Sequence, residues 1–170
     1  MTFSFLYQWF PKSITSKGRT IIKDGQTLRP LLATTLIKDG VSLPFEAIVD
    51  SGSDKTISFE EIGIALGTNF LNEKFRVETE IKTGMPFEDE IFGLGKEPIR
   101  AFITLMDIEV TGHKQTVRMY WIREKFDPHS DFALVLGQDS IFSMFDIHFS
   151  KRQYKFFLND QVFQPDSAQK

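Results

Sequence analysis

The sequence predicts an all-β fold, a small β-barrel or sandwich with one or two short helices. Three observations support this fold class: short apolar runs recur at close spacing, Gly-containing turns separate them, and only two segments have the features of a helix. At 170 residues the chain is expected to form one domain with a sizeable core.

The predicted strands alternate with turns along the chain. Leu31 to Ile37 is an apolar, Thr-rich run, and Lys38-Asp39-Gly40 turns it back into the run from Phe45 to Val49, which is a hairpin signal. A second hairpin is expected around the turn at 111–114. The strands that complete the prediction are 101–110, 116–122, 132–136, 147–149 and 154–158.

Two short helices are predicted. The first runs from Phe59 to Leu66, because Ser58 and Glu61 have the spacing of a capping box and Gly67 can close the C-terminus. The second covers Asp139 to Phe145, where apolar residues recur on one side.

The chain is expected to divide into an N-terminal arm (1–27), a folded domain (28–163) and a disordered tail (164–170). Within the arm, Phe3 to Phe10 is apolar but lacks a basic leader and a small-residue cleavage site. We interpret it as an ordered arm or a docking strand. The polar stretch from 69 to 90 has no clear assignment.

Composition excludes several functions. A net charge of -3, with Lys and Arg scattered, gives no reason to expect a nucleic-acid partner. No apolar run is long enough to span a bilayer, so no membrane partner is expected and a cytoplasmic location follows by default. The absence of Cys excludes disulfides, zinc thiolates and cysteine nucleophiles. The three His are far apart in sequence, so we expect no metal and no cofactor. The 18 Phe predict a core of large rings.

The most informative motif is Asp50-Ser51-Gly52-Ser53, which follows the apolar run from Phe45 to Val49. A carboxylate is costly to keep at the end of a buried strand unless a partner or a reaction uses it. Taken alone, such a tripeptide also occurs in ordinary turns. The motif occurs once, since Asp24-Gly25 and Asp39-Gly40 lack the preceding apolar strand and the following Ser.

In this context the chain resembles the retropepsin-like aspartic proteases, whose active-site turn has the pattern Asp-Thr/Ser-Gly-Ala/Ser. A second element supports the resemblance: Ala133-Leu134-Val135-Leu136-Gly137, followed by a short helix and Asp146-Ile147-His148-Phe149, is similar to the family's closing strands. The resemblance covers roughly residues 29–158. It implies a closed or partly open β-barrel of the retropepsin-like type and a peptide or protein substrate.

The resemblance also implies roles for individual residues. Asp50 is the catalytic acid, Ser51 donates a hydrogen bond across the dimer, and Gly52 leaves an amide near the carboxylate. Ser53 replaces the commoner Ala, and Asp54 matches an acid that holds the substrate backbone. Two further features complete the comparison: Gln138 stands where many viral members have Arg, and a flap with Gly93, Leu94 and Gly95 at its tip is expected between 90 and 100.

Peptide hydrolysis by this route needs two carboxylates that share one proton across a water molecule; the aspartic-protease dyad is a standard example of this effect. A chain with one motif must take its second Asp50 from another copy, so the enzyme hypothesis implies a C2 homodimer. Two alternatives remain open. One is a catalytically silent peptide-binding or scaffold module on the same fold, and the other is an unrelated β-barrel that binds a small ligand.

Overall fold

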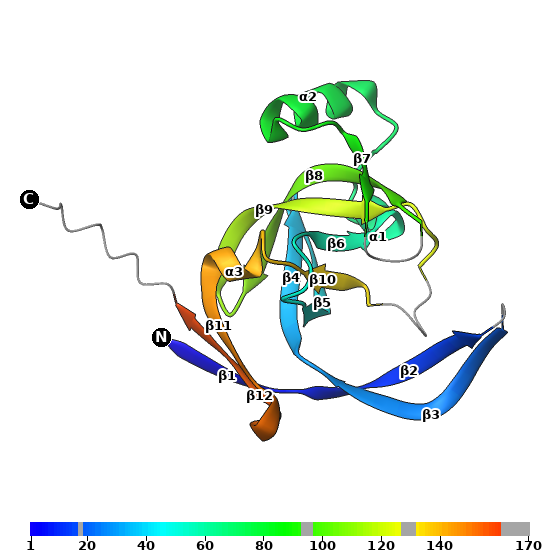
Figure 1. Ribbon diagram of the computed structural model, residues 1–170. Helices are drawn as coiled ribbons and strands as arrows, with labels where there is room; N and C mark the ends of the chain where they lie inside the picture. Colours follow the sequence, from blue (N-terminus) through cyan, green and yellow to red (C-terminus); the bar gives the residue numbers. More distant parts are fainter. Residues whose placement is uncertain (17–18, 93–96, 127–131, 161–170) are drawn as a thin grey trace, which may run out of the picture.

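Six strands close a β-barrel, as the sequence predicts (Figure 1). The computed structural model describes residues 1–16, 19–92, 97–126 and 132–160, with the side chains of 9–27 outside that description. Around the barrel the order is β4-β5-β10-β6-β9-β8, and β8 pairs back onto β4 to close it. These strands are β4 (Leu31–Lys38), β5 (Val41–Val49), β6 (Thr56–Phe59), β8 (Ile99–Val110), β9 (His113–Ile122) and β10 (Leu134–Leu136), and β7 (Glu88–Ile91) adds to the outer edge of β8.

Two tight turns set the register of the barrel hairpins. Asp39 and Gly40 both have positive φ, 49° and 84°, and join β4 to β5 with Lys38 opposite Val41. Thr111 and Gly112, with φ of 51° and 83°, join β8 to β9 in the same way. Positive φ at both central positions matches the twist of antiparallel strands, so both predicted hairpins are confirmed.

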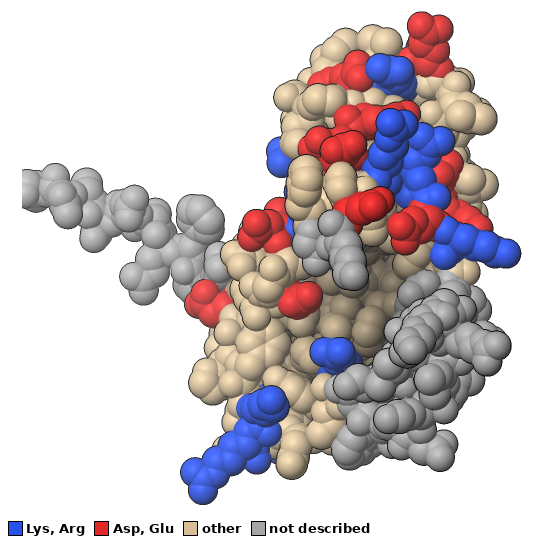
Figure 2. All heavy atoms as spheres, turned by 45° about the vertical axis from the view of Figure 1, so that its right-hand side comes forward, with Lys and Arg blue, Asp and Glu red and all other residues tan. Residues whose placement is uncertain are grey.

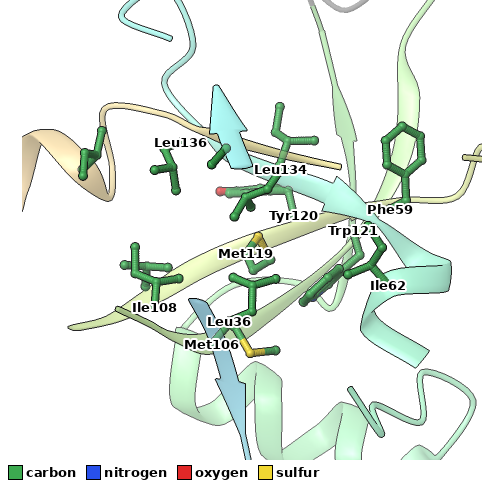
Figure 3. Close-up of a cluster of buried hydrophobic side chains, with 14 of the residues drawn as sticks. Leu36, Phe59, Ile62, Met106, Ile108, Met119, Tyr120, Trp121, Leu134 and Leu136 are labelled. Carbon is green, nitrogen blue, oxygen red and sulfur yellow. The ribbon is translucent and has the colours of Figure 1, made fainter. Parts of the chain in front are cut away.

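The core fills the barrel with large side chains (Figure 3). Leu36 of β4, Met106 of β8, Met119 of β9 and Leu134 of β10 are completely or almost completely buried and point toward one another. Trp121 is also fully buried, and its indole Nε1 donates to Thr104 Oγ1 at 2.7 Å, so the polar atom of this ring is satisfied. The expectation that Phe rings enter the core holds for Phe59, Phe70, Phe87, Phe102, Phe145 and Phe156.

The first predicted helix is present as α1 (Glu60–Ala65), but its predicted capping box is wrong. Ser58 lies inside β6, where it is buried and its hydroxyl donates to the Ala133 carbonyl at 2.6 Å. The hydroxyl therefore joins two strands instead of capping the helix. Gly67 closes the helix as expected, with φ of 80° and its N–H bonded to the Ile64 carbonyl.

The second predicted helix is shorter than expected, because α3 covers only Ile141–Met144 and Phe145 already begins β11 (Phe145–Ser150). The segment without an assignment holds a further helix, α2 (Glu73–Thr83). Asn72 caps this helix by accepting a hydrogen bond from the Phe75 N–H, and Gly84 ends it in the left-handed conformation.

The chain termini form a second sheet beside the barrel. β1 (Thr2–Leu6) pairs with β12 (Lys155–Asp160), which pairs with β11, while the short helix η1 (Lys151–Gln153) joins β11 to β12. The Met1 ammonium forms an ion pair of 2.9 Å with Asp160, so the start of β1 is tied to the end of β12. The predicted tail at 164–170 lies outside the described residues.

Between β1 and the barrel, the chain forms a two-stranded ribbon, β2 (Gln8–Ser16) and β3 (Arg19–Arg29). It runs below the barrel in Figure 1 and extends beyond it. Charged side chains of both signs gather at the opposite end of the molecule, around α2 and β7, whereas the face below them is largely uncharged (Figure 2). Among the described residues, no helix combines the length and the apolar character that crossing a membrane requires.

Candidate active site

Asp50 is the first residue after β5, at the place where three strands meet. β10 lies between β5 and β6 and runs parallel to the former and antiparallel to the latter. Its last residue, Leu136, is opposite Val49, and the Leu136 carbonyl accepts the Asp50 N–H at 3.1 Å. The Val49 N–H donates to the Pro30 carbonyl at 2.9 Å. The backbone that leads into Asp50 is therefore held by two segments distant in sequence.

The turn after Asp50 places its carboxylate at the surface. The Gly52 N–H donates to Asp50 Oδ1 at 2.9 Å, and the Ser53 N–H donates to the Asp50 carbonyl at 3.3 Å. Asp50, Ser51 and Gly52 are all exposed. One carboxylate oxygen is thus oriented by a backbone amide, and the acid faces outward from the barrel instead of entering its core. Sequence reasoning anticipated this amide.

A second loop, which follows β10, brackets the turn. The Gln138 N–H donates to the Ser53 carbonyl at 2.8 Å, and the Asp139 N–H donates to the Asp54 carbonyl at 3.1 Å. The Gln138 side chain adds a bond of 2.7 Å from Nε2 to the Ser51 carbonyl. Gln138 was noted in the sequence only as a departure from Arg. The observed hydrogen bond shows that the side-chain amide of Gln138 directly restrains the turn that carries Asp50.

Beneath the two loops lies a polar centre that the sequence reasoning missed. Thr56 is fully buried at the start of β6, and its hydroxyl donates to Asp139 Oδ1 at 2.8 Å and contacts the Ser140 hydroxyl. The same oxygen accepts the Gly137 N–H at 3.2 Å. A Thr after a polar turn carries no distinctive sequence signal. Its role depends on residues more than 80 positions away.

Desolvation raises the pKa of the Asp139 carboxyl, although the hydrogen bond from Thr56 acts in the opposite direction. Asp54, the other acid of this edge, is exposed, and its backbone carbonyl accepts the Asp139 N–H. Next to it, the Lys55 ammonium lies 4.7 Å from the centre of the Tyr120 ring, where a cation–π contact holds it.

Part of the expected flap lies within the described residues. β7 and β8 form an antiparallel pair that ends with Ile91 opposite Ile99, so the described strands flank the expected flap on both sides. Gly93, Leu94 and Gly95 lie outside the described residues. Phe92, which follows β7, is exposed, whereas Phe102 of β8 is buried and its ring stacks on that of Phe70 with 4.9 Å between centroids, so Phe102 belongs to the core.

With this geometry in place, comparison with solved structures shows a likeness to retropepsin-like folds. A retropepsin-like aspartic protease from Rickettsia conorii has a TM-score of 0.49 and 12% identity, with 94% of each chain covered. The retroviral protease-like domain of Ddi1 from Leishmania major has a TM-score of 0.42 and 13% identity, covering 76% of this chain and 93% of that domain.

Neither a protein-family model nor a curated protein sequence matches the chain. The assignment of a closed barrel rests on the strand pairing of the chain itself. In this pairing β10 lies between the strand that precedes Asp50 and the strand that follows it.

Other polar groups lie away from this edge. His113 lies 3.4 Å from Asp160 in the terminal sheet, His148 faces Phe157, and His129 is outside the described residues. No group of three metal-binding side chains occurs in the described part of the chain. A hollow of about 300 Å³ opens beside α2 and β7, and Arg123 closes one side of it by packing on Phe102 and pairing with Glu60 and Glu88.

Proposed function

We propose that two copies of this chain form an aspartic endopeptidase, with one Asp50 from each. The observation that carries the proposal is the presentation of Asp50: an exposed carboxylate at the end of a core strand, oriented by the Gly52 amide and braced from below by β10. An exposed acid on a rigid strand end can meet its symmetry mate without moving the barrel.

The proposed reaction divides the work between the two acids. One ionised Asp50 takes a proton from a water molecule that lies between the carboxyl groups, and the resulting hydroxide attacks the peptide carbonyl carbon. The other Asp50 is protonated and donates to the carbonyl oxygen as negative charge develops there. The amide nitrogen then receives a proton and leaves as the new amino terminus, while one acid and one carboxylate are restored. Because like charges a few ångströms apart do not both ionise readily, the pair shares one proton at the working pH.

The remaining site residues have supporting roles in this proposal. Ser51 is exposed next to Asp50, and in this proposal its hydroxyl hydrogen-bonds across the two-fold axis. Asp54 is solvated and accessible to a substrate backbone N–H. Gly93, Leu94 and Gly95 would form the lid over an extended peptide.

Cleavage of an unfolded protein between acidic and neutral pH tests the proposal, with Asp50→Asn as the inactive variant. Asn keeps the size of the side chain and an oxygen for the Gly52 amide, so the fold should be retained. We expect cleavage by the wild type and none by the variant. Equal activity of both proteins would contradict the proposal, and peptide binding without cleavage by the wild type would favour the silent binding module.

A further inference from the structure

The β2–β3 ribbon is a sheet of its own. The two strands, of 9 and 11 residues, pair with each other and with no other strand of the described chain. Each therefore presents one row of N–H and C=O groups that has no strand beside it. A two-stranded ribbon of this kind is only marginally stable in water, so its persistence calls for a further body to pack against.

The base of the ribbon is fixed next to Asp50. β3 ends at Arg29, and the following residue, Pro30, accepts the Val49 N–H at 2.9 Å. Leu31 then enters the barrel opposite Ile48. The ribbon thus leaves the barrel at the strand end that holds the Asp50 turn, and it extends beyond the barrel (Figure 1).

The charge of the ribbon differs from that of the rest of the chain. Residues 8–29 hold five of the 20 Lys and Arg but one of the 23 Asp and Glu, which leaves 15 basic and 22 acidic side chains elsewhere. At the neighbouring edge, Asp50 and Asp54 are exposed acids. A basic ribbon beside an acidic body is complementary to a second copy of the same chain.

The ribbon register also places apolar residues opposite each other. Trp9 is paired with Leu28, and Ile14 with Ile21, on either side of an irregularity between Pro11 and Ser13. Apart from this irregularity, the pairing runs along both strands of the ribbon.

We propose that the β2–β3 ribbon is a clasp for a second copy of this chain. Each copy extends its ribbon from the Asp50 edge onto the barrel of the other, in a two-fold arrangement in which the same surfaces meet reciprocally. The inference deepens the proposed function, since it names the segment that holds the two Asp50 turns together. It concerns association, and its test therefore does not depend on catalysis.

The first test replaces residues 10–27 with a short Gly-Ser linker and follows mass against concentration by sedimentation velocity. We expect the wild type to dimerise and the linker variant to be a monomer at the same concentration, with at least a tenfold higher dissociation constant. Circular dichroism checks that the barrel is retained. A variant that dimerises as tightly as the wild type, or a wild type that is monomeric throughout, would overturn the clasp.

The second test keeps the ribbon intact and changes only its charge. Lys12→Glu/Lys23→Glu should weaken dimerisation at least tenfold, and added salt should weaken the wild type as well. Lys74→Glu/Lys82→Glu is the matched control, because both lysines are exposed on α2 at the other end of the molecule. Equal effects of the two double variants would contradict a specific role for the ribbon.

Activity separates this inference from the proposed function. Asp50→Asn should dimerise like the wild type and be inactive. If the wild type dimerises through the ribbon but cleaves nothing, the clasp stands and the protease proposal fails. If the linker variant is more active than the wild type at equal concentration, the ribbon is an inhibitory segment and the clasp is wrong.

Discussion

Gly137 lies against the backbone of Lys55 so closely that a Cβ on the glycine would be 2.3 Å from the Lys55 carbonyl oxygen. The contact joins the loop after β10 to the loop that carries Asp50 and Asp54. Because backbone atoms stand on both sides, neither side can rotate away to make room. The absence of a side chain at position 137 is thus what lets β10 fit between β5 and β6.

Gly137→Ala is expected to destabilise the fold by about 3 kcal/mol or more, because its methyl group would meet backbone. Urea denaturation measures this loss. Gly112→Ala is the control: Gly112 has positive φ but open space around it, so the cost there should be about 1 kcal/mol. Similar losses for the two variants would contradict the steric explanation.

Thr56→Val removes the hydroxyl that accepts the buried Gly137 N–H and donates to Asp139. A buried amide without an acceptor costs about 1–3 kcal/mol, so a loss of that size is expected in thermal or urea unfolding. Thr56→Ser keeps the hydroxyl and should retain most of the stability. If Thr56→Val, which keeps the methyl group, is as stable as the wild type, the hydroxyl does not stabilise this centre.

Gln138→Ala deletes the bond from Nε2 to the Ser51 carbonyl. Since the side chain is exposed, stability should fall by no more than about 1 kcal/mol. The turn that carries Asp50 loses a brace, so kcat on a peptide substrate should decrease by up to about tenfold, with KM less affected. Gln153→Ala, an exposed glutamine on η1, serves as the control. An unchanged kcat would show that the turn is positioned without Gln138.

The pH dependence of stability should differ between two acids. Hydrogen bonds from Thr116 and Lys114 lower the pKa of Asp107. Its stabilising contribution is therefore full above the usual aspartate pKa near 3.8 and is lost as the pH falls through the lowered folded value. Desolvation raises the pKa of Asp139, so that residue destabilises the fold above its raised value, and the penalty disappears below about 3.8.

Urea unfolding at pH 7 and at a pH below the usual aspartate pKa of 3.8 checks both signs. Asp107→Asn should be less stable than the wild type at pH 7, with the difference shrinking in acid. Asp139→Asn should match or exceed the wild type at pH 7, because an amide oxygen can still accept the Thr56 hydroxyl. Parallel pH profiles of the two variants would contradict the assignment.

Local signals in the sequence were sufficient for the barrel hairpins and for the Asp50 turn. The Asp39-Gly40 and Thr111-Gly112 turns require residues that tolerate positive φ, and the three residues before Asp50, Ala47 to Val49, are apolar. α2 was missed because it buries little: Val77 and Ile81 are exposed, so its apolar residues do not form a regular stripe.

Features that depend on distant contacts could not be predicted. Ser58 has the spacing of a capping box, yet pairing of β6 with β10 uses its hydroxyl for Ala133 instead. The pairing of Thr2 with Asn159 joins opposite ends of the chain and leaves no local signal. The same is true of Thr56, whose partners follow β10.

The position of β10 also has a consequence for synthesis of the protein. Its three residues, 134–136, complete the barrel and accept the Asp50 N–H, although they follow Asp50 by more than 80 positions. A nascent chain that has emerged only as far as β9 already contains the Asp50 motif but lacks the strand that fixes it. The acid is therefore positioned only after most of the polypeptide has left the ribosome, which delays formation of the site until the fold that restrains it is nearly complete.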